Sequence, residues 1–186
     1  MSLSAKLYKR MKKRLLKSPD CDGNLQNETN IIIISIFRIF GLWHFSTFDT
    51  TISMKEEFPI FVNIFPELIR RLQKKVKKLR IGFILFRDYG EEYLTKIEPL
   101  NNNLNELEHF LRNTVIKGGQ DIPEALNEAI YDFRKMTFET DSKRTAFILT
   151  DAPAHPVPKG NITEEMAKEK IEELGIKANI ICLPYR

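Results

Sequence analysis

The residues most able to do chemistry follow an apolar, aromatic stretch. In "FDTTISMKEE" (48–57), Asp49 ends a run of apolar residues, and hydroxyl side chains follow at Thr51 and Ser53. In a loop that curls around a ligand, these two hydroxyls can point inward together while the residues between them point elsewhere. One carboxylate and two hydroxyls are oxygen donors of the kind that bind a hard cation.

Two more aspartates occupy comparable places. Asp151 directly follows the apolar segment "TAFILT" (145–150), and Asp121 ends a glycine-bearing loop (117–121) that opens a helix. Ligands of parallel α/β sheets bind beyond the carboxyl ends of the strands. The pattern therefore predicts a Mg²⁺ (or Mn²⁺) site at that edge, because magnesium takes octahedral oxygen coordination and keeps several waters. The predicted metal ligands are Asp49, Thr51, Ser53, Asp121 and Asp151.

Strands and helices must alternate to bring these residues together. Apolar runs of strand length occupy 41–48, 79–86, 93–97, 145–150 and 177–183, and helical spacing occupies 61–76, 104–111, the later part of 117–133, and 163–174. Asn102 or Asn103 is expected to cap the second helix, and Pro123 to lie in the first turn of the third. The alternation predicts a Rossmann-like, doubly wound α/β fold, with a mainly parallel sheet and helices on both faces.

The length and composition suit one soluble domain with a short basic extension. The 186 residues match the usual size of a single hydrophobic core. Residues 1–30 are expected to form a basic N-terminal helix and a polar linker, and residues 31–186 the domain. Cys21 and Cys182 supply no disulfide framework. The net charge of +4 gathers in the first 17 residues and in "RRLQKKVKKLR" (70–80).

Four blocks carry a resemblance to a known family. They are "DTTISM" (49–54), "FRDYGEE" (86–92), "GGQDIPEA" (118–125) and "TDAPAH" (150–155). In this order they resemble the "DTTGSM", "YRDYGDE", "GGGDxPEA" and "TDAPPH" blocks of microbial von Willebrand factor A domains. The resemblance covers the chain from about Leu42 to Leu183.

The resemblance implies a metal-ion-dependent adhesion site. Thr51 and Ser53 are then direct ligands beside Asp49, while Asp151 acts through water or hydrogen bonds. A partner protein fills a vacant coordination position with an acidic side chain. Asp121 stands where many relatives use threonine. It is therefore expected to hold the metal well and to weaken the binding of an acidic partner. Gln120 and His155 are candidates for a loop that contacts this ligand.

The sequence also departs from the family pattern. Ile52 and Gln120 replace glycines of two blocks, and glycine permits backbone angles that isoleucine resists. A degenerate scaffold that binds no metal is therefore an alternative. Family members normally add a helix after the last strand, whereas this sequence ends at Arg186, so that helix is expected to be absent.

Other functions remain as alternatives to a non-enzymatic interaction module. A magnesium-dependent aspartate phosphotransferase or phosphatase could use Asp49 as its nucleophile, but "DTTIS" lacks the adjacent second acid that such enzymes need. Nucleic-acid binding is not favoured, since no recognition motif accompanies the basic runs. A membrane tether through 31–48 is less favoured than a buried strand, because Arg38 and His44 interrupt the run. The compartment stays open, with the cytoplasm favoured over a membrane anchor.

Overall fold

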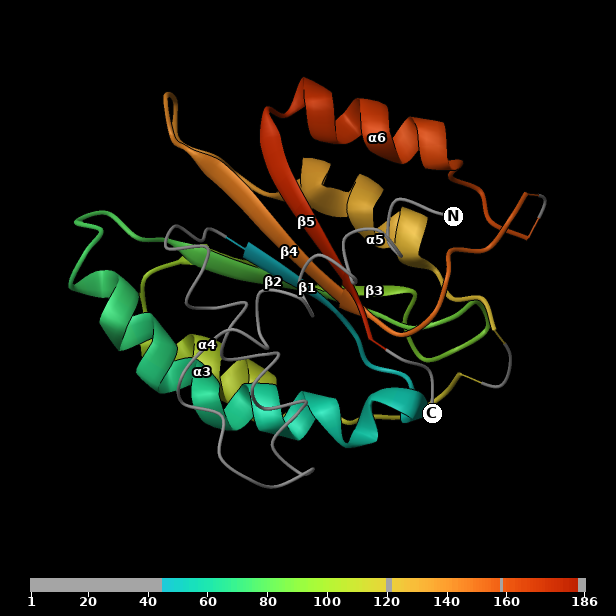
Figure 1. Cartoon of the computed structure of the whole chain (residues 1–186), viewed down its shortest axis with the longest axis horizontal. Coiled ribbons are helices and arrows are strands. Elements are labelled where there is room, and N and C mark those ends of the chain that lie inside the picture. Colours follow the sequence, from blue (N-terminus) through green and yellow to red (C-terminus); the bar gives the residue numbers. More distant parts are fainter. Residues whose placement is uncertain (1–44, 120–121, 158, 184–186) are drawn as a thin grey trace, which may run out of the picture. The chain divides into compact units, whose positions relative to one another are not determined.

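Five strands form one mixed sheet in the order β3-β2-β1-β4-β5 (Figure 1). The computed structural model describes residues 45–119, 122–157 and 159–183. The strands are β1 (Phe45–Asp49), β2 (Ile81–Phe86), β3 (Thr95–Asn101), β4 (Arg144–Thr150) and β5 (Ile176–Cys182). β1 runs parallel to β2 and β4, and β5 runs parallel to β4, whereas β3 pairs antiparallel with β2. The predicted α/β fold with a mainly parallel sheet is confirmed.

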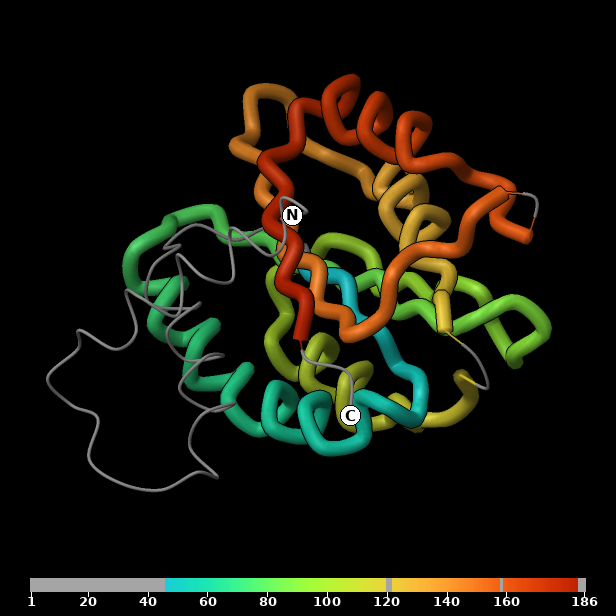
Figure 2. The backbone as a smooth tube through the Cα atoms, turned by 45° about the vertical axis from the view of Figure 1, so that its right-hand side comes forward, coloured from blue at the N-terminus to red at the C-terminus, as the bar shows by residue number. Residues whose placement is uncertain are grey.

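Helices cover both faces of the sheet, as the prediction of a doubly wound fold requires. They are α3 (Glu57–Gln73), α4 (Leu104–Arg112), α5 (Leu126–Tyr131) and α6 (Glu164–Glu173), with short 3₁₀ turns η1 (Ile52–Lys55) and η2 (Asp132–Lys135). The pair α3 and α4 lies on one face, and the pair α5 and α6 lies on the other (Figures 1 and 2). The predicted N-terminal helix and linker fall outside the described residues.

Local capping fixes several helix ends. The side chain of Asn103 accepts hydrogen bonds from the backbone N–H groups of Asn105 and Glu106 at the start of α4. Thr163 caps α6 in the same way through the N–H of Met166. Gly175 follows α6 with φ of +62°, a left-handed conformation that glycine adopts without steric cost.

The prediction for Pro123 was wrong. It does not lie in the first turn of a helix, because α5 begins only at Leu126. Glu124 instead pairs with the loop after β4: its N–H donates to the carbonyl of Pro153, and its own carbonyl accepts from the N–H of His155. This pairing ties the segment after the glycine loop to the carboxyl end of β4.

Apolar side chains on the two faces of the sheet hold the strand ends in place. On the α3 side, Phe48 packs against Phe58, Phe61 and Phe83, with ring centroids 4.1–6.2 Å apart. On the α5 side the buried core includes Ile84, Phe86, Leu126, Ala129, Ile130, Phe133 and Ile148. Every residue of β2 is buried. The carboxyl ends of β1, β2 and β4 therefore emerge from a rigid frame.

Candidate metal centre

The register of the sheet brings two of the predicted acids to one edge. β1 and β4 are neighbours, parallel, and paired through Phe48 and Leu149. Asp49 therefore ends its strand beside the point where Thr150 ends β4 and Asp151 begins the next loop. Asp49 has no exposed surface, while Asp151 is half-buried.

A connected set of hydrogen bonds joins four of the predicted ligands. The N–H and the hydroxyl of Thr51 both donate to Asp49 Oδ1, at 2.9 and 2.6 Å. Thr51 Oγ1 lies 3.1 Å from Ser53 Oγ, which donates to Asp151 Oδ1 at 3.0 Å. Asp121 and Gln120 lie outside the described residues. The rest of the predicted set converges at the carboxyl edge of the sheet.

Thr150 belongs to the same cluster, although it is not among the metal ligands predicted from the sequence. Its hydroxyl lies 3.2 Å from Asp49 Oδ2 and 3.1 Å from the carbonyl of Ala152, and it accepts a hydrogen bond from the N–H of Ala152. Thr150 thus holds the second oxygen of Asp49 and shapes the turn that carries Asp151. Its position in the "TDAPAH" block, directly before Asp151, is the sequence feature that could have predicted this role.

The glycine loop packs directly against the first loop. The N–H of Ile52 donates to the carbonyl of Gly118, and the N–H of Lys117 donates to the carbonyl of Thr50. Gly119 has φ of +75°, and a Cβ placed on it would lie 2.7 Å from Thr51 Cβ. Only glycine fits this approach, so the loop is anchored two residues before Asp121.

Ile52 replaces a glycine of the family pattern without adopting a backbone conformation that only glycine permits. It begins η1, and Asp141 is the only non-glycine residue with positive φ among the residues described. The backbone at Ile52 therefore needs no glycine. Its side chain is 50% exposed to solvent.

Burial raises the pKa of both carboxyl groups in the cluster. It raises the pKa of Asp49 from 3.8 to about 6, and the nearby charge of Asp151 adds to the rise against the hydrogen bonds from Thr51 and Thr150. Burial also raises the pKa of Asp151, against the hydrogen bond from Ser53. A cation between these two carboxylates would relieve the cost of keeping both ionised.

The spacing of the oxygens suits magnesium. Neighbouring ligands of an octahedral Mg²⁺ with bonds of about 2.0–2.1 Å stand about 2.9 Å apart. The oxygen pairs here are 2.6, 3.1 and 3.0 Å apart. The hydroxyls of Thr51 and Ser53 have only two protons between them, too few to form hydrogen bonds at all three of these contacts. A cation shared by these oxygens needs no proton between them. In the described part of the chain, no three His, Cys, Asp or Glu side chains converge as a metal site, so the match rests on hydroxyls as well as acids.

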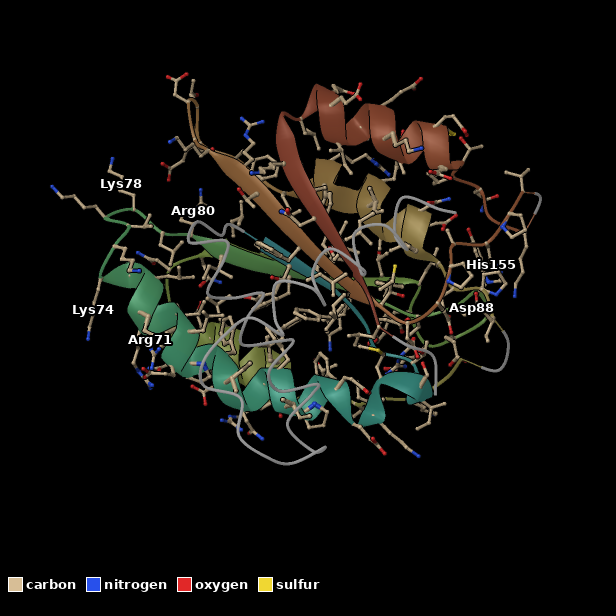
Figure 3. All side chains as sticks on the ribbon, in the orientation of Figure 1. Arg71, Lys74, Lys78, Arg80, Asp88 and His155 are labelled. Atoms are coloured by element: carbon tan, nitrogen blue, oxygen red, sulfur yellow. The ribbon has the colours of Figure 1, made fainter. Side chains whose placement is uncertain are left out.

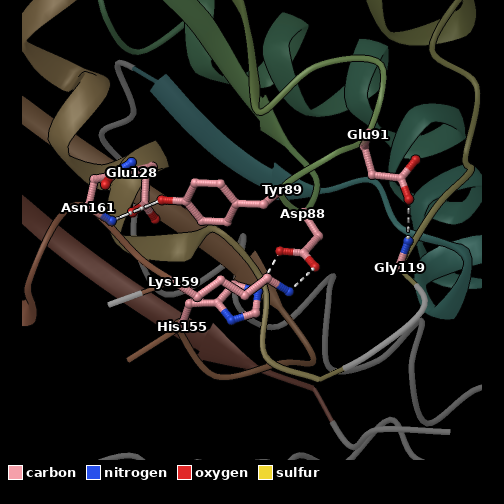
Figure 4. A network of polar contacts seen from close by, with 8 residues as sticks. All are labelled: Asp88, Tyr89, Glu91, Gly119, Glu128, His155, Lys159 and Asn161. Carbon is pink, nitrogen blue, oxygen red and sulfur yellow. Dashed lines mark hydrogen bonds and ion pairs between the residues drawn. The ribbon is translucent and has the colours of Figure 1, made fainter. Parts of the chain in front are cut away.

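A second polar cluster lies beside this edge (Figure 4). Asp88, after β2, is buried and accepts hydrogen bonds from His155 Nε2 and from Lys159 Nζ, the latter at 3.1 Å. The buried carboxylate of Glu128 accepts from the hydroxyl of Tyr89. The contacts of Asp88 fasten the loop after β4 to the loop after β2, and the contact between Tyr89 and Glu128 fastens the loop after β2 to α5.

His155 was predicted as a candidate for ligand contact. It is only 4% exposed, and its ring lies edge-on to that of Tyr89. In this arrangement His155 holds the loop through Asp88. The "FRDYGEE" and "TDAPAH" blocks contain both partners, but their sequence separation of 67 residues hid the contact.

The fold is a Rossmann-like α/β fold with a mainly parallel sheet, and the oxygen cluster lies at the carboxyl edge of that sheet. The chain is similar in structure to an aerotolerance-related membrane protein from Bacteroides fragilis, with 19% identity over 76% of this chain and 67% of that one, and a TM-score of 0.52. It is similar to the BatB protein from Bacteroides thetaiotaomicron, with 17% identity over 76% and 66% and a TM-score of 0.55.

A third likeness comes from outside bacteria. Proximal thread matrix protein 1 of the mussel byssus matches with 15% identity over 78% of this chain and 38% of its own, and a TM-score of 0.60. No known family model matches the sequence, and no curated protein is significantly similar to it. The chain spans about two thirds of the two Bacteroides proteins. These likenesses establish the fold.

The predicted membrane tether (31–48) is described only at its end. Phe45–Asp49 is β1, the central strand of the sheet, and the preceding residues fall outside the described part of the chain. Within the described part, none of the helices has the length and apolar character needed to cross a bilayer.

Proposed function

We propose that this protein is a divalent-metal-dependent protein-interaction module with a metal-ion-dependent adhesion site. The observation that carries the proposal is the connected set of oxygens from Asp49 through Thr51 and Ser53 to Asp151. These side chains come from two neighbouring strand ends and have the spacing of ligands around one small cation. The von Willebrand factor A-like fold agrees with this use of the carboxyl edge.

Each residue has a distinct proposed role. Thr51 and Ser53 bind the ion directly, and Asp49 and Asp151 supply charge next to it. Asp121 completes the set from the glycine loop. Thr150 is a positioning residue, because its hydroxyl reaches the oxygen of Asp49 that Thr51 does not. Bound Mg²⁺ or Mn²⁺ would supply a Lewis-acidic position for an incoming carboxylate.

The proposed partner is a protein that presents an acidic side chain. Ser53 and Asp151 are less buried than Asp49 and Thr51, so a ligand would approach the ion from their side. Asp121 adds negative charge to the set, which lowers the attraction for a second carboxylate. We therefore propose modest affinity for each contact, with specificity supplied by the surrounding loops.

A two-stage titration tests this function. The protein is first loaded with Mn²⁺, and glutarate is then added as a simple carboxylate while the relaxation of water protons reports the waters on the ion. We expect glutarate to displace water, and Asp121→Thr to raise the affinity for glutarate. Loss of Mn²⁺ from Asp121→Thr without tighter glutarate binding contradicts the role given to Asp121.

The same samples separate this function from the enzyme alternative. A phosphotransferase that uses Asp49 would turn over p-nitrophenyl phosphate with Mg²⁺ and lose that activity in Asp49→Asn. An interaction module gives no turnover in either protein. A folded protein that binds neither Mn²⁺ nor Mg²⁺ would be a scaffold with the shape of the family alone.

A further inference from the structure

A dense basic cluster lies where α3 ends and the chain turns toward β2. Its seven members lie within residues 70–80. They are Arg70, Arg71, Lys74, Lys75, Lys77, Lys78 and Arg80. All are exposed except Arg80, whose side chain is 31% exposed. We call this set the α3–β2 basic cluster; the proposed metal site makes no use of it.

The backbone beneath this cluster is held in place. Leu72 and Leu79 are buried on either side of the turn. The carbonyl of Leu72 also accepts hydrogen bonds from the N–H groups of Lys75 and Val76, at 2.8 and 2.9 Å. The lysines thus project from an anchored turn, and Figure 3 shows Lys74 and Lys78 extending away from the sheet.

Local acids neutralise only part of the charge. Among the described residues, Glu67 pairs with Arg71 and Glu139 pairs with Arg80, while no ion pair involves the four lysines. Seven positive charges less two paired acids leave five. Basic residues in the last turn of a helix complement its dipole, but the effect fades beyond that turn, so it does not account for Lys77 and Lys78.

We propose that the α3–β2 basic cluster binds the surface of a membrane that contains acidic phospholipids. An exposed corner rich in lysine suits a diffuse layer of negative charge. The described exposed large apolar side chains include no aromatic residue on which bases could stack. The cluster also lacks a helix N-terminus or ribbon to enter a groove of duplex DNA. The lipid surface is therefore the better match.

The α3–β2 basic cluster and the candidate metal centre lie at opposite ends of the sheet. The cluster precedes β2 and lies at the amino ends of the parallel strands, whereas the candidate metal centre lies at their carboxyl ends. Figure 3 shows Arg71, Lys74, Lys78 and Arg80 at the opposite end of the sheet from Asp88 and His155. A strand such as β2 spans about 20 Å. A membrane held by the basic cluster would leave the metal edge facing solution.

Co-sedimentation of the full chain with vesicles tests the proposal. The vesicles contain either phosphatidylcholine alone or phosphatidylcholine with phosphatidylserine, in EDTA so that bound metal plays no part. Each lysine near an acidic leaflet contributes about a fivefold factor in partitioning. We expect Lys74→Gln/Lys75→Gln/Lys78→Gln to bind phosphatidylserine vesicles on the order of 100-fold more weakly than the wild-type protein.

A matched variant controls for net charge. Lys55→Gln/Lys117→Gln/Lys168→Gln removes three exposed lysines from other surfaces and should retain nearly all binding. Equal losses in the two triple variants, or no loss in the first, overturn the proposal even if the basic N-terminal segment also binds. Binding of the wild-type protein to duplex DNA that displaces it from vesicles at equal salt would instead assign the cluster to nucleic acid.

Discussion

Replacing Asp49 with asparagine should make the metal-free protein more stable, although it removes a central residue of the proposed site. The buried carboxylate has a pKa of about 6 where an ordinary aspartate has 3.8. Keeping it ionised in the folded state therefore costs about 3 kcal/mol at neutral pH. Asparagine has the same shape and no charge.

The hydrogen bonds around this position can all survive the substitution. The amide oxygen can accept from the N–H and hydroxyl of Thr51, as Asp49 Oδ1 does. The amide nitrogen can donate to Thr150 Oγ1, whose proton then goes to the carbonyl of Ala152. The gain from removing the charge is therefore not offset by a buried group left unpaired.

Urea unfolding in EDTA at two pH values measures this effect. A raised pKa in the folded state means that the cost is absent below about pH 4 and complete above about pH 6. Asp49→Asn should match the wild-type protein near pH 4 and exceed its free energy of unfolding by about 2–3 kcal/mol near pH 7.5. A variant that is less stable than the wild-type protein at pH 7.5 in EDTA refutes the electrostatic reasoning.

Four other outcomes follow from the same contacts. Asp88→Asn should lower the free energy of unfolding by about 2 kcal/mol in urea titrations, since it weakens a buried acceptor of His155 and Lys159. Thr150→Val should cost about 1–3 kcal/mol in the same assay, because the buried N–H of Ala152 loses its acceptor; unchanged stability in either variant contradicts these contacts. Ile52→Gly should leave the Mg²⁺ affinity within about threefold by calorimetry, because the backbone there is right-handed; a large gain would mean that isoleucine does impair the site. Mg²⁺ affinity should rise between about pH 5 and pH 7.5, since protonation of Asp49 removes the charge that holds the ion; a flat profile would exclude a role for the Asp49 charge in binding the ion.

Much of the fold was predictable because its signals are local. Continuous apolar runs mark buried strands, and Asn103 and Thr163 stand at the starts of helices where capping residues belong. The antiparallel pairing of β3 with β2 could also have been predicted from the sequence. Only residues 87–94 separate β2 from β3, too few for the crossover of a dozen or more that a parallel pair needs.

The contacts that the sequence hid are those between distant segments. The late start of α5 depends on backbone bonds between Glu124 and the loop after β4, which override the local preference of Pro123. In the sequence, Asp88 resembles a surface acid, because its partner His155 lies 67 residues further along the chain. By contrast, Asp49 and Asp151 were predictable as neighbours because parallel strands present their carboxyl ends at one edge.

Calorimetric titration of Mg²⁺ and Mn²⁺ into the metal-free full chain tests the central claim most directly. Asp49→Asn serves as the site variant, and Glu169→Gln, an exposed acid on α6, serves as the matched control. We predict one saturable site in the wild-type protein and the control, and none in Asp49→Asn. A folded wild-type protein that binds neither ion, or an Asp49→Asn variant that binds as the wild-type protein does, would contradict the metal-site account.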